Sequence, residues 1–362
     1  ENEAQFSSVL AHELAHLSQR HFARGIEARK QSSAASMAGL LGGLVAIAAG
    51  AGDAGIAAIM GGQAAAMDSQ LRYSRQHEQE ADRVGMQNQV SAGLDPGGAA
   101  GMFEVMQADS RRYGSRPPEF LLTHPLTETR IADAKNRAAQ YPKRIYQDNP
   151  EYQLMRARVQ VSFFDDPDKA VAHFRQQRKK GGKQAVPAQY GLILALSRAG
   201  NYAEARELLK PMREFRPDSI IYLVTEADID IAEGKYDKAI ATLEQNLALN
   251  PGNHPMTMSL GKAYEKGGYF EKADRLLSRH ARDHSSDAQL WYLLAEVQGK
   301  AGNILGLHQS RAEYFYLNGA MQQAVDQLNL ALKRATNQVT VERIHTRIAY
   351  FQAVGRALGS MG

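Results

Sequence analysis

The chain contains 362 residues, of which 44% are hydrophobic, and its formal net charge is +4. This length predicts two or three domains with packed cores, and the mild charge without a basic cluster argues against nucleic acid as a partner. No cysteine is present, which excludes thiol catalysis, disulfides and cysteine-ligated zinc and leaves histidines and carboxylates to bind any metal.

The first predicted helix runs from about Ala4 to Lys30 and contains the pattern His-Glu-x-x-His at His12, Glu13 and His16. Each helical residue turns by about 100°, so these three side chains project into one sector. Two imidazoles one turn apart can hold a zinc ion, with the glutamate beside the water on that ion. The alternative is an exposed helix that carries these polar residues by chance.

Apolar residues surround this polar sector, namely Phe6, Val9, Leu10, Leu14 and Leu17. Burying the sector among them without a metal would be costly, which favours zinc.

A peptidase normally has more structure upstream, including a strand that lines the cleft. Because Glu1 lies only eleven residues before His12, we expect the N-terminal part of this domain to be missing. The chain starts without a signal peptide, which in a fragment says nothing about the compartment.

A nearly uncharged segment follows, in which Asp53 is the only charged residue between Gln31 and Met67. Residues 37–67 are dominated by alanine and glycine. Asp53 divides them into two arms of about fourteen residues, each shorter than the roughly 20 residues that span a bilayer. Three interpretations stay open: a helical hairpin that packs closely through small residues, a hydrophobic flap that dips into a membrane surface or covers the cleft, and a transmembrane span.

A second motif lies in a helix predicted to begin at Ser74, as its N-cap, and to stop at Gly93. Glu78 and Asp82 are four residues apart and share one face of this helix. A zinc ion with two histidine ligands needs a third protein ligand and an open position, which Glu78 is predicted to supply. Asp82 could accept a hydrogen bond from the outer nitrogen of a zinc-binding histidine.

The residues beside Glu78 and Asp82 on this helix are not predicted to be the main metal ligands. Ala81 and Gly85 are small and would let the helix approach another one closely. Glu80 lies about 200° from Glu78 around the helix and is interpreted as solvated. His77, about 100° away, is a weaker ligand candidate. The alternative for the whole segment is a solvated, charged helix face.

The chain thus contains three motifs in order: HELAH at 12–16, SRQHEQEAD at 74–82 and THPLTETRI at 123–131. Together they resemble the zinc metallopeptidases of the HtpX and CAAX-prenyl-peptidase type over roughly residues 1–140. The resemblance implies a mostly helical gluzincin domain with His12, His16 and Glu78 as zinc ligands and Glu13 as the base. The chain departs from the membrane-embedded members because it shows no true membrane-spanning helices.

His124 lies in the third motif, where Pro125 disfavours a helical conformation at the residue before it. The histidine is therefore predicted on a loop, just before a helix that starts near Leu126. Three roles stay open: a buried histidine bonded to the backbone, a hydrogen-bond donor to the oxyanion, and a fourth zinc ligand. The fourth ligand would displace the catalytic water and hold the enzyme inactive until the loop moves.

Beyond about Tyr146, glycines recur with a period of 34 residues, at Gly200, Gly234, Gly268 and Gly302. The same period relates Ala205, Ala239 and Ala273, and also Pro217 and Pro251. A helix–turn–helix period of this length with small residues at fixed positions is the tetratricopeptide signature. The glycine makes the turn, the alanine allows tight helix packing, and the proline ends the second helix.

The ends of this array are irregular. A fourth unit opens at Trp291, but Leu307 stands where alanine is expected. The pattern restarts out of phase at Gly319, as in a terminal cap, and residues 168–171 suggest a degenerate first unit. Such repeats stack into a solenoid with a concave face, which favours the binding of a protein substrate or partner. The alternative is a spacer or dimerisation arm.

The sequence therefore predicts a mainly α-helical chain with a metallopeptidase domain at 1–145 and an α-solenoid of tetratricopeptide repeats at 146–362. This order of domains resembles the periplasmic members of the family that act in Gram-negative outer-membrane assembly. The resemblance implies one zinc ion per chain, a periplasmic location with possible peripheral contact to the outer membrane, and misassembled proteins and the assembly machinery as partners. The alternative function is a non-proteolytic chaperone or scaffold with a latent zinc site, acting through its repeats.

Overall fold

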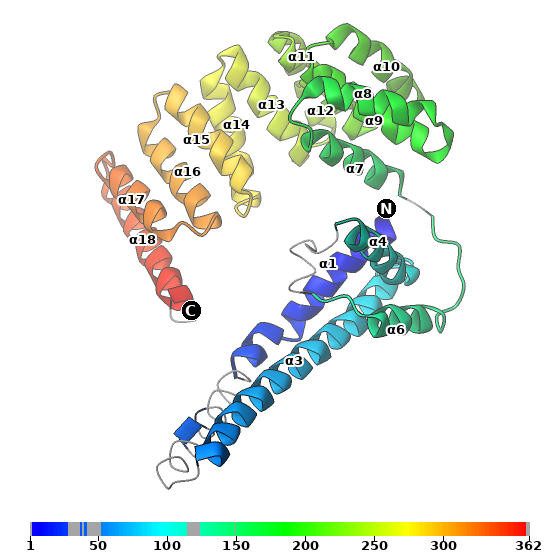
Figure 1. Cartoon of the computed structure of the whole chain (residues 1–362). Helices are drawn as coiled ribbons and strands as arrows, with labels where there is room; N and C mark the ends of the chain where they lie inside the picture. Colours follow the sequence, from blue (N-terminus) through cyan, green and yellow to red (C-terminus); the bar gives the residue numbers. More distant parts are fainter. Residues whose placement is uncertain are drawn as a thin grey trace. The chain divides into compact units, whose positions relative to one another are not determined.

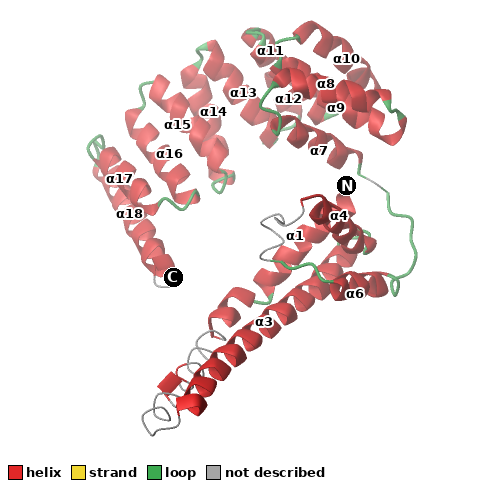
Figure 2. Ribbon diagram, viewed as in Figure 1, coloured by secondary structure: helices red, strands yellow, loops and turns green. Residues whose placement is uncertain are grey.

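The computed structural model describes residues 2–27, 37, 40–41, 52–113, 124–147 and 149–359. Within these ranges every regular element is a helix and no strand occurs (Figure 2). The prediction of a mainly α-helical chain is confirmed. The chain forms two compact units, Glu1–Gln153 and Leu154–Gly362.

The first unit is built on two helices that lie side by side, α1 and α3, with two further helices at one end of the pair (Figure 1). The four helices are α1 (Glu3–Ser18), α3 (Gly52–Ser91), α4 (Gly97–Tyr113) and α6 (Glu128–Ala138). A small core of Met86, Ala100, Phe103 and Ala134 joins α3, α4 and α6. This core fixes α6, and the loop before it, against the helix that carries Glu78.

The first helix is shorter than predicted, because it ends at Ser18 instead of continuing to Lys30. Arg20 adopts a positive φ of 53°, a conformation that interrupts an α-helix. The chain becomes helical again over residues 21–27. This break lies four residues after His16, and it places His21 beside that residue.

The second motif also lies in a longer helix than predicted. α3 begins at Gly52 and runs without interruption to Ser91, so the assignment of Ser74 as an N-cap is wrong. The residues upstream of Ser74 are rich in alanine, glutamine and methionine, which are good helix formers, and no breaker separates them from the charged half. The predicted stop is confirmed, since Gly93 has a φ of 76° just after the helix.

The apolar segment 37–67 is described only in part, because residues 38–39 and 42–51 lie outside the described ranges. Its second arm forms the start of α3. Among the described residues, no helix combines the length and the hydrophobicity that crossing a membrane requires. The hairpin and flap interpretations of this segment remain predictions.

The close approach of α1 and α3 depends on small residues, as the sequence predicts. Ala15 and Ala81 are fully buried. A Cβ atom placed on Gly85 would lie 3.0 Å from the backbone nitrogen of His12 and 3.1 Å from the carbonyl carbon of Ala11. The missing side chain at this position therefore lets the two helices meet at the His-Glu-x-x-His motif.

Replacing Gly85 by alanine should destabilise the first unit by about 1–3 kcal/mol, because overpacking against rigid backbone forces the helices apart. The measurement is chemical denaturation of the purified chain. The matched control is Gly61→Ala in the same helix, where a Cβ atom would meet nothing within 4 Å. The control should be neutral or stabilising by up to about 1 kcal/mol. Equal stabilities for the two variants would contradict this packing.

The second unit is a succession of antiparallel helix pairs (Figure 1). Its helices are α7 (Pro150–Ser162), α8 (Pro167–Lys179), η1 (Gly182–Gln184), α9 (Ala185–Arg198), α10 (Tyr202–Phe215), α11 (Ile220–Ala232), α12 (Tyr236–Leu249), α13 (His254–Gly267), α14 (Phe270–Asp283), α15 (Ala288–Lys300), α16 (Ile304–Leu317), α17 (Met321–Leu332) and α18 (Gln338–Gly359). The predicted α-solenoid of repeats is confirmed.

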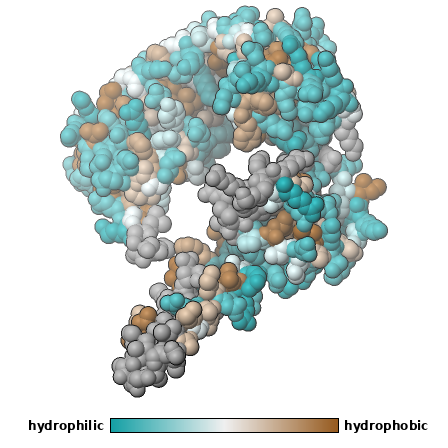
Figure 3. All heavy atoms as spheres, viewed as in Figure 1, coloured by the Kyte–Doolittle hydropathy of each residue, from teal (hydrophilic) through white to brown (hydrophobic). Residues whose placement is uncertain are grey.

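The periodic residues have the roles that the sequence predicts. The four glycines all adopt positive φ angles, between 74° and 83°, in the turns between paired helices, where L-residues with side chains would be strained. The three periodic alanines are fully buried. On the face shown in Figure 3, hydrophilic residues cover most of this unit.

Candidate metal centre

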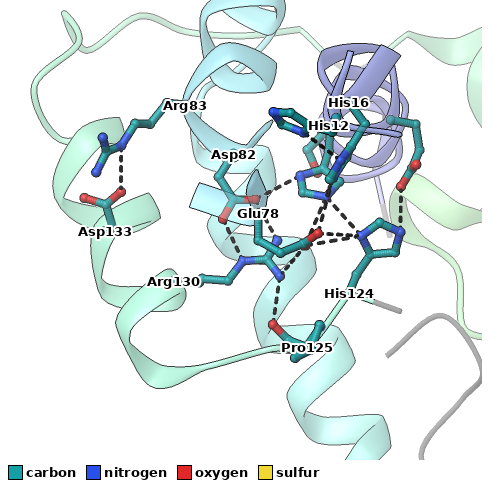
Figure 4. Close-up of polar contacts among 12 residues, drawn as sticks. His12, His16, Glu78, Asp82, Arg83, His124, Pro125, Arg130 and Asp133 are labelled. Atoms are coloured by element: carbon teal, nitrogen blue, oxygen red, sulfur yellow. Dashed lines mark hydrogen bonds and ion pairs between the residues drawn. The ribbon is translucent and has the colours of Figure 1, made fainter. Parts of the chain in front are cut away.

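Four side chains from three parts of the first unit converge on one point (Figure 4). His12 and His16 come from α1, Glu78 comes from α3, and His124 comes from the loop before α6. His12 and Glu78 are buried, with 7% and 5% of their surface exposed, and the other two are half-buried. Each contributes one ring nitrogen or carboxylate oxygen, and these four atoms lie within 4.8 Å of one another.

The spacing of these atoms fits a single tetrahedral ion. Nε2 of His12 lies 3.0 Å from Nε2 of His16, 3.4 Å from Nδ1 of His124 and 3.5 Å from Glu78. Glu78 lies 3.4 Å from Nε2 of His16 and 3.1 Å from Nδ1 of His124. Ligands about 2.05 Å from a tetrahedral zinc ion are about 3.3 Å apart. The donor set and its geometry therefore both fit zinc.

His12 is oriented by a carboxylate on the far side of its ring. Its Nδ1 atom lies 3.0 Å from Asp82 Oδ1, so this nitrogen donates its proton and leaves the Nε2 lone pair facing the centre. Metal-binding histidines commonly have such a partner. Asp82 therefore lies on the ring nitrogen of His12 that faces away from the four-donor group.

Sequence reasoning missed Arg130, which is buried with 6% of its surface exposed. Its guanidinium donates to both oxygens of Asp82, at 2.7 and 2.8 Å, and lies 2.9 Å from Glu78. It also donates to the carbonyl oxygen of Pro125 at 2.8 Å. One side chain therefore holds both carboxylates and the backbone next to His124 (Figure 4).

The interpretation of Glu80 as simply solvated is wrong. Nδ1 of His21 lies 2.9 Å from Nδ1 of His16, and Nε2 of His21 lies 3.1 Å from Glu80. Glu80 also accepts a hydrogen bond from Arg24 at 3.0 Å. Glu80 and His21 therefore orient His16 from outside, in the way that Asp82 orients His12.

His77, the weaker ligand candidate, lies outside the group of four donors. Its ring stacks on that of His21, with centroids 4.1 Å apart and planes 4° from parallel. Burial, followed by the charges of His21 and Arg24, lowers the pKa of His77 to about 4. This ring supports the histidine that orients His16.

The charged groups at the centre favour the binding of a cation. Burial by itself would raise the pKa of Glu78, but hydrogen bonds from the histidines and the charge of Arg130 hold it well below its ordinary value. The pKa of Asp82 is also lowered, chiefly by Arg130. Burial lowers the pKa of His12, yet Asp82 and Glu78 outweigh this effect and raise it to about 9. Two carboxylates face one guanidinium, so the centre favours a further positive charge, either a proton or a metal ion.

Glu13 lies beside this group without belonging to it. Its Oε1 atom is buried and accepts no hydrogen bond, and it lies 3.7 Å from Nε2 of His124. A buried carboxylate oxygen without a hydrogen bond is costly and is available to accept a proton from a bound molecule. The His124 ring therefore faces the four-donor group with one nitrogen and Glu13 with the other.

The apolar environment expected for the motif is only partly present. Four of the five apolar neighbours on α1 are exposed, namely Phe6, Leu10, Leu14 and Leu17. The buried face of the helix consists instead of Ser8, Ala11, His12 and Ala15. The close packing of α1 on α3 brings His12 and Glu78 together, and bulky residues of α1 do not enclose them.

The sequence is similar to known families in both units. Residues 1–138 match peptidase family M48, and residues 230–297 match a tetratricopeptide repeat family. The beta-barrel assembly-enhancing protease of Escherichia coli K12 is 35% identical over 334 residues, which are 91% of this chain and 68% of that protein. The protein of the same name from Yersinia pestis is 33% identical over 92% of this chain and 68% of its own length.

Proposed function

Since the chain belongs to the family of beta-barrel assembly-enhancing proteases and its first unit to peptidase family M48, we propose that it is a zinc-dependent endopeptidase of the periplasm. It degrades misassembled outer-membrane proteins and also assists their assembly in a chaperone-like way. Its repeats bind protein substrates and the outer-membrane assembly machinery, in keeping with their match to tetratricopeptide repeats. Peripheral contact with the outer membrane is part of the same proposal.

The observation that carries the proposal is the group of His12, His16, Glu78 and His124 at tetrahedral spacing, with the Glu13 carboxylate at its edge. His12, His16 and Glu78 would hold one zinc ion per chain. When bound, zinc polarises the scissile carbonyl and lowers the pKa of a coordinated water to about 7. Asp82 and the His21–Glu80 pair keep the two rings in the orientation that presents Nε2 to the ion.

Glu13 is the group that moves protons in this proposal. It accepts a proton from the attacking water and delivers it to the nitrogen of the leaving amine. Its Oε1 atom, which has no hydrogen-bond partner, is suited to the first step. His124 would act as a reversible fourth ligand, because its Nδ1 atom lies 3.4 Å from Nε2 of His12 and 3.1 Å from Glu78. The enzyme is then closed until the His124–Pro125 loop moves.

A zinc site that His124 keeps closed permanently would give the chain a second candidate function. If His124 never leaves the fourth corner, the zinc site is latent and the chain acts only as a chaperone or scaffold through its repeats. Glu13 argues for the peptidase, since a purely structural zinc site needs no base.

Digestion of an unfolded outer-membrane β-barrel protein, with casein as a general substrate, separates these two functions. We expect the purified chain to cleave both substrates, to lose this activity in a strong chelator, and to regain it when zinc is restored. Suppression of substrate aggregation is measured in the same samples. Aggregation that is suppressed without cleavage at any zinc level would support the chaperone and contradict the peptidase.

A further inference from the structure

A second group of histidines lies in the repeat unit, where α13, α14 and α15 meet. His254 is the first residue of α13, His280 lies in the last turn of α14, and His284 is the C-cap of α14. One ring nitrogen from each lies within 4.8 Å of those from the other two. This group belongs to the second unit and shares no residue with the candidate metal centre.

The three rings face one another closely. His280 and His284 are four residues apart, the same spacing as His12 and His16, and their ring centroids are 3.9 Å apart. Nδ1 of His254 lies 2.9 Å from Nε2 of His280. His280 is buried and the other two are half-buried. Three imidazoles with one position left for water form a known ligand set for zinc.

A carboxylate and a backbone carbonyl determine which nitrogen carries the lone pair in two of the rings. Nε2 of His254 lies 3.1 Å from Oδ2 of Asp287, so it donates a proton there and leaves Nδ1 free to bind. Nδ1 of His284 donates to the carbonyl oxygen of His280 at 3.2 Å and leaves Nε2 free. Metal-binding histidines use carboxylates and backbone carbonyls in this way.

Asp287 is itself held in place. It is the N-cap of α15, and its Oδ1 atom accepts hydrogen bonds from the backbone nitrogens of Gln289 and Leu290 at 2.8 and 3.1 Å. Its two oxygens therefore serve separate roles, one in the helix cap and one on His254. This arrangement connects the orientation of His254 in one repeat with the start of the next repeat.

We propose that His254, His280 and His284 form a second metal site, which takes one divalent transition-metal ion of the kind that imidazole favours, with Zn²⁺ as its probe. The ion connects the start of α13 to the end of α14. It also stabilises the start of α15, because Asp287 contacts His254 and caps that helix. It therefore stabilises the junction between two consecutive repeats. Without metal, a single proton shared by His254 and His280 would satisfy the two facing nitrogens, and the experiment distinguishes the two cases.

Zinc content is measured on the full chain without an affinity tag, after saturation with Zn²⁺ and removal of free ion. We expect the wild type to hold one zinc more than His284→Gln and one more than His280→Gln. Zinc at the candidate metal centre cancels in this difference, so the result does not depend on the proposed peptidase. Equal zinc content in the wild type and the folded His284→Gln variant would overturn the proposal.

Two further variants sharpen the test. Asp287→Asn keeps a good helix cap but loses the carboxylate on His254, and it should weaken zinc binding at this site by about 10- to 100-fold. His308→Gln is the control, because His308 lies in α16 with its Nδ1 atom 2.9 Å from Gln327 and outside the group. It should bind as much zinc as the wild type.

The single tryptophan of the chain provides a local signal. Nε1 of Trp291 donates to the carbonyl oxygen of Ser285 at 2.8 Å, in the loop between His284 and Asp287. Co²⁺ bound at this site should quench Trp291 fluorescence in the wild type and in His308→Gln, and not in His284→Gln. Quenching that is equal in all three proteins would place the ion elsewhere and overturn the site.

Discussion

Glutamine in place of Glu13 should lower the rate of substrate cleavage by roughly 100- to 10,000-fold, the range that a general base contributes, and leave the zinc content unchanged. The amide keeps the size of the side chain but cannot accept the proton of the attacking water. Zinc content is expected to persist because Glu13 is not among the four converging donors. The measurement combines steady-state cleavage of casein with metal analysis of the same sample.

The control for this variant is Glu104→Gln. Glu104 is an exposed residue of α4 whose carboxylate lies 2.7 Å from Lys135, away from the metal centre. It should cleave at the wild-type rate. Cleavage by Glu13→Gln at that same rate would refute the assignment of Glu13 as the base, and loss of zinc from the variant would show that Glu13 acts on the metal instead.

Alanine in place of His124 should raise cleavage, including self-cleavage, because it removes the ligand that closes the site. If the closed form makes up 90–99% of the molecules, the gain is about 10- to 100-fold. The structure motivates this expectation, since Nδ1 of His124 lies 3.1 Å from Glu78 and 3.4 Å from His12. Initial rates and the half-life of the intact chain are the two quantities to measure.

The other roles of His124 predict different results for the same variant. Loss of an oxyanion donor would lower cleavage by roughly 100-fold or more, and an unchanged rate would leave only a structural role. His345→Ala is a suitable control, because His345 is exposed on α18. Either of the two other results would contradict the regulatory role.

The spacing of residues on single helices made much of the site predictable. His12 and His16 share a face because they are about one turn apart, with Glu13 about 100° from His12, and Glu78 and Asp82 share a face for the same reason. Residue spacing along one helix could not predict the contacts between different helices. Arg130 lies on an amphipathic helix where an arginine would ordinarily be exposed, and only the structure shows that it holds Glu78 and Asp82.

His21 and Glu80 were missed for a related reason. On an unbroken helix His21 would lie about 140° from His16 and point elsewhere. The turn at Arg20, with its positive φ, brings the two rings together, and no glycine or proline in the sequence marks that turn. Glu80 then joins from α3 through His21. The repeats were easier to predict, because the glycine period records a backbone requirement directly.

His12, His16 and Glu78 are proposed to hold one zinc ion beside Glu13. Anomalous diffraction at the zinc edge from crystals of the Glu13→Gln protein tests it most directly, since that variant should keep its metal and leave its own chain uncut. We expect an anomalous peak about 2.1 Å from Nε2 of His12, from Nε2 of His16 and from the Glu78 carboxylate. A zinc-saturated crystal with these three side chains ordered and no peak between them would contradict it.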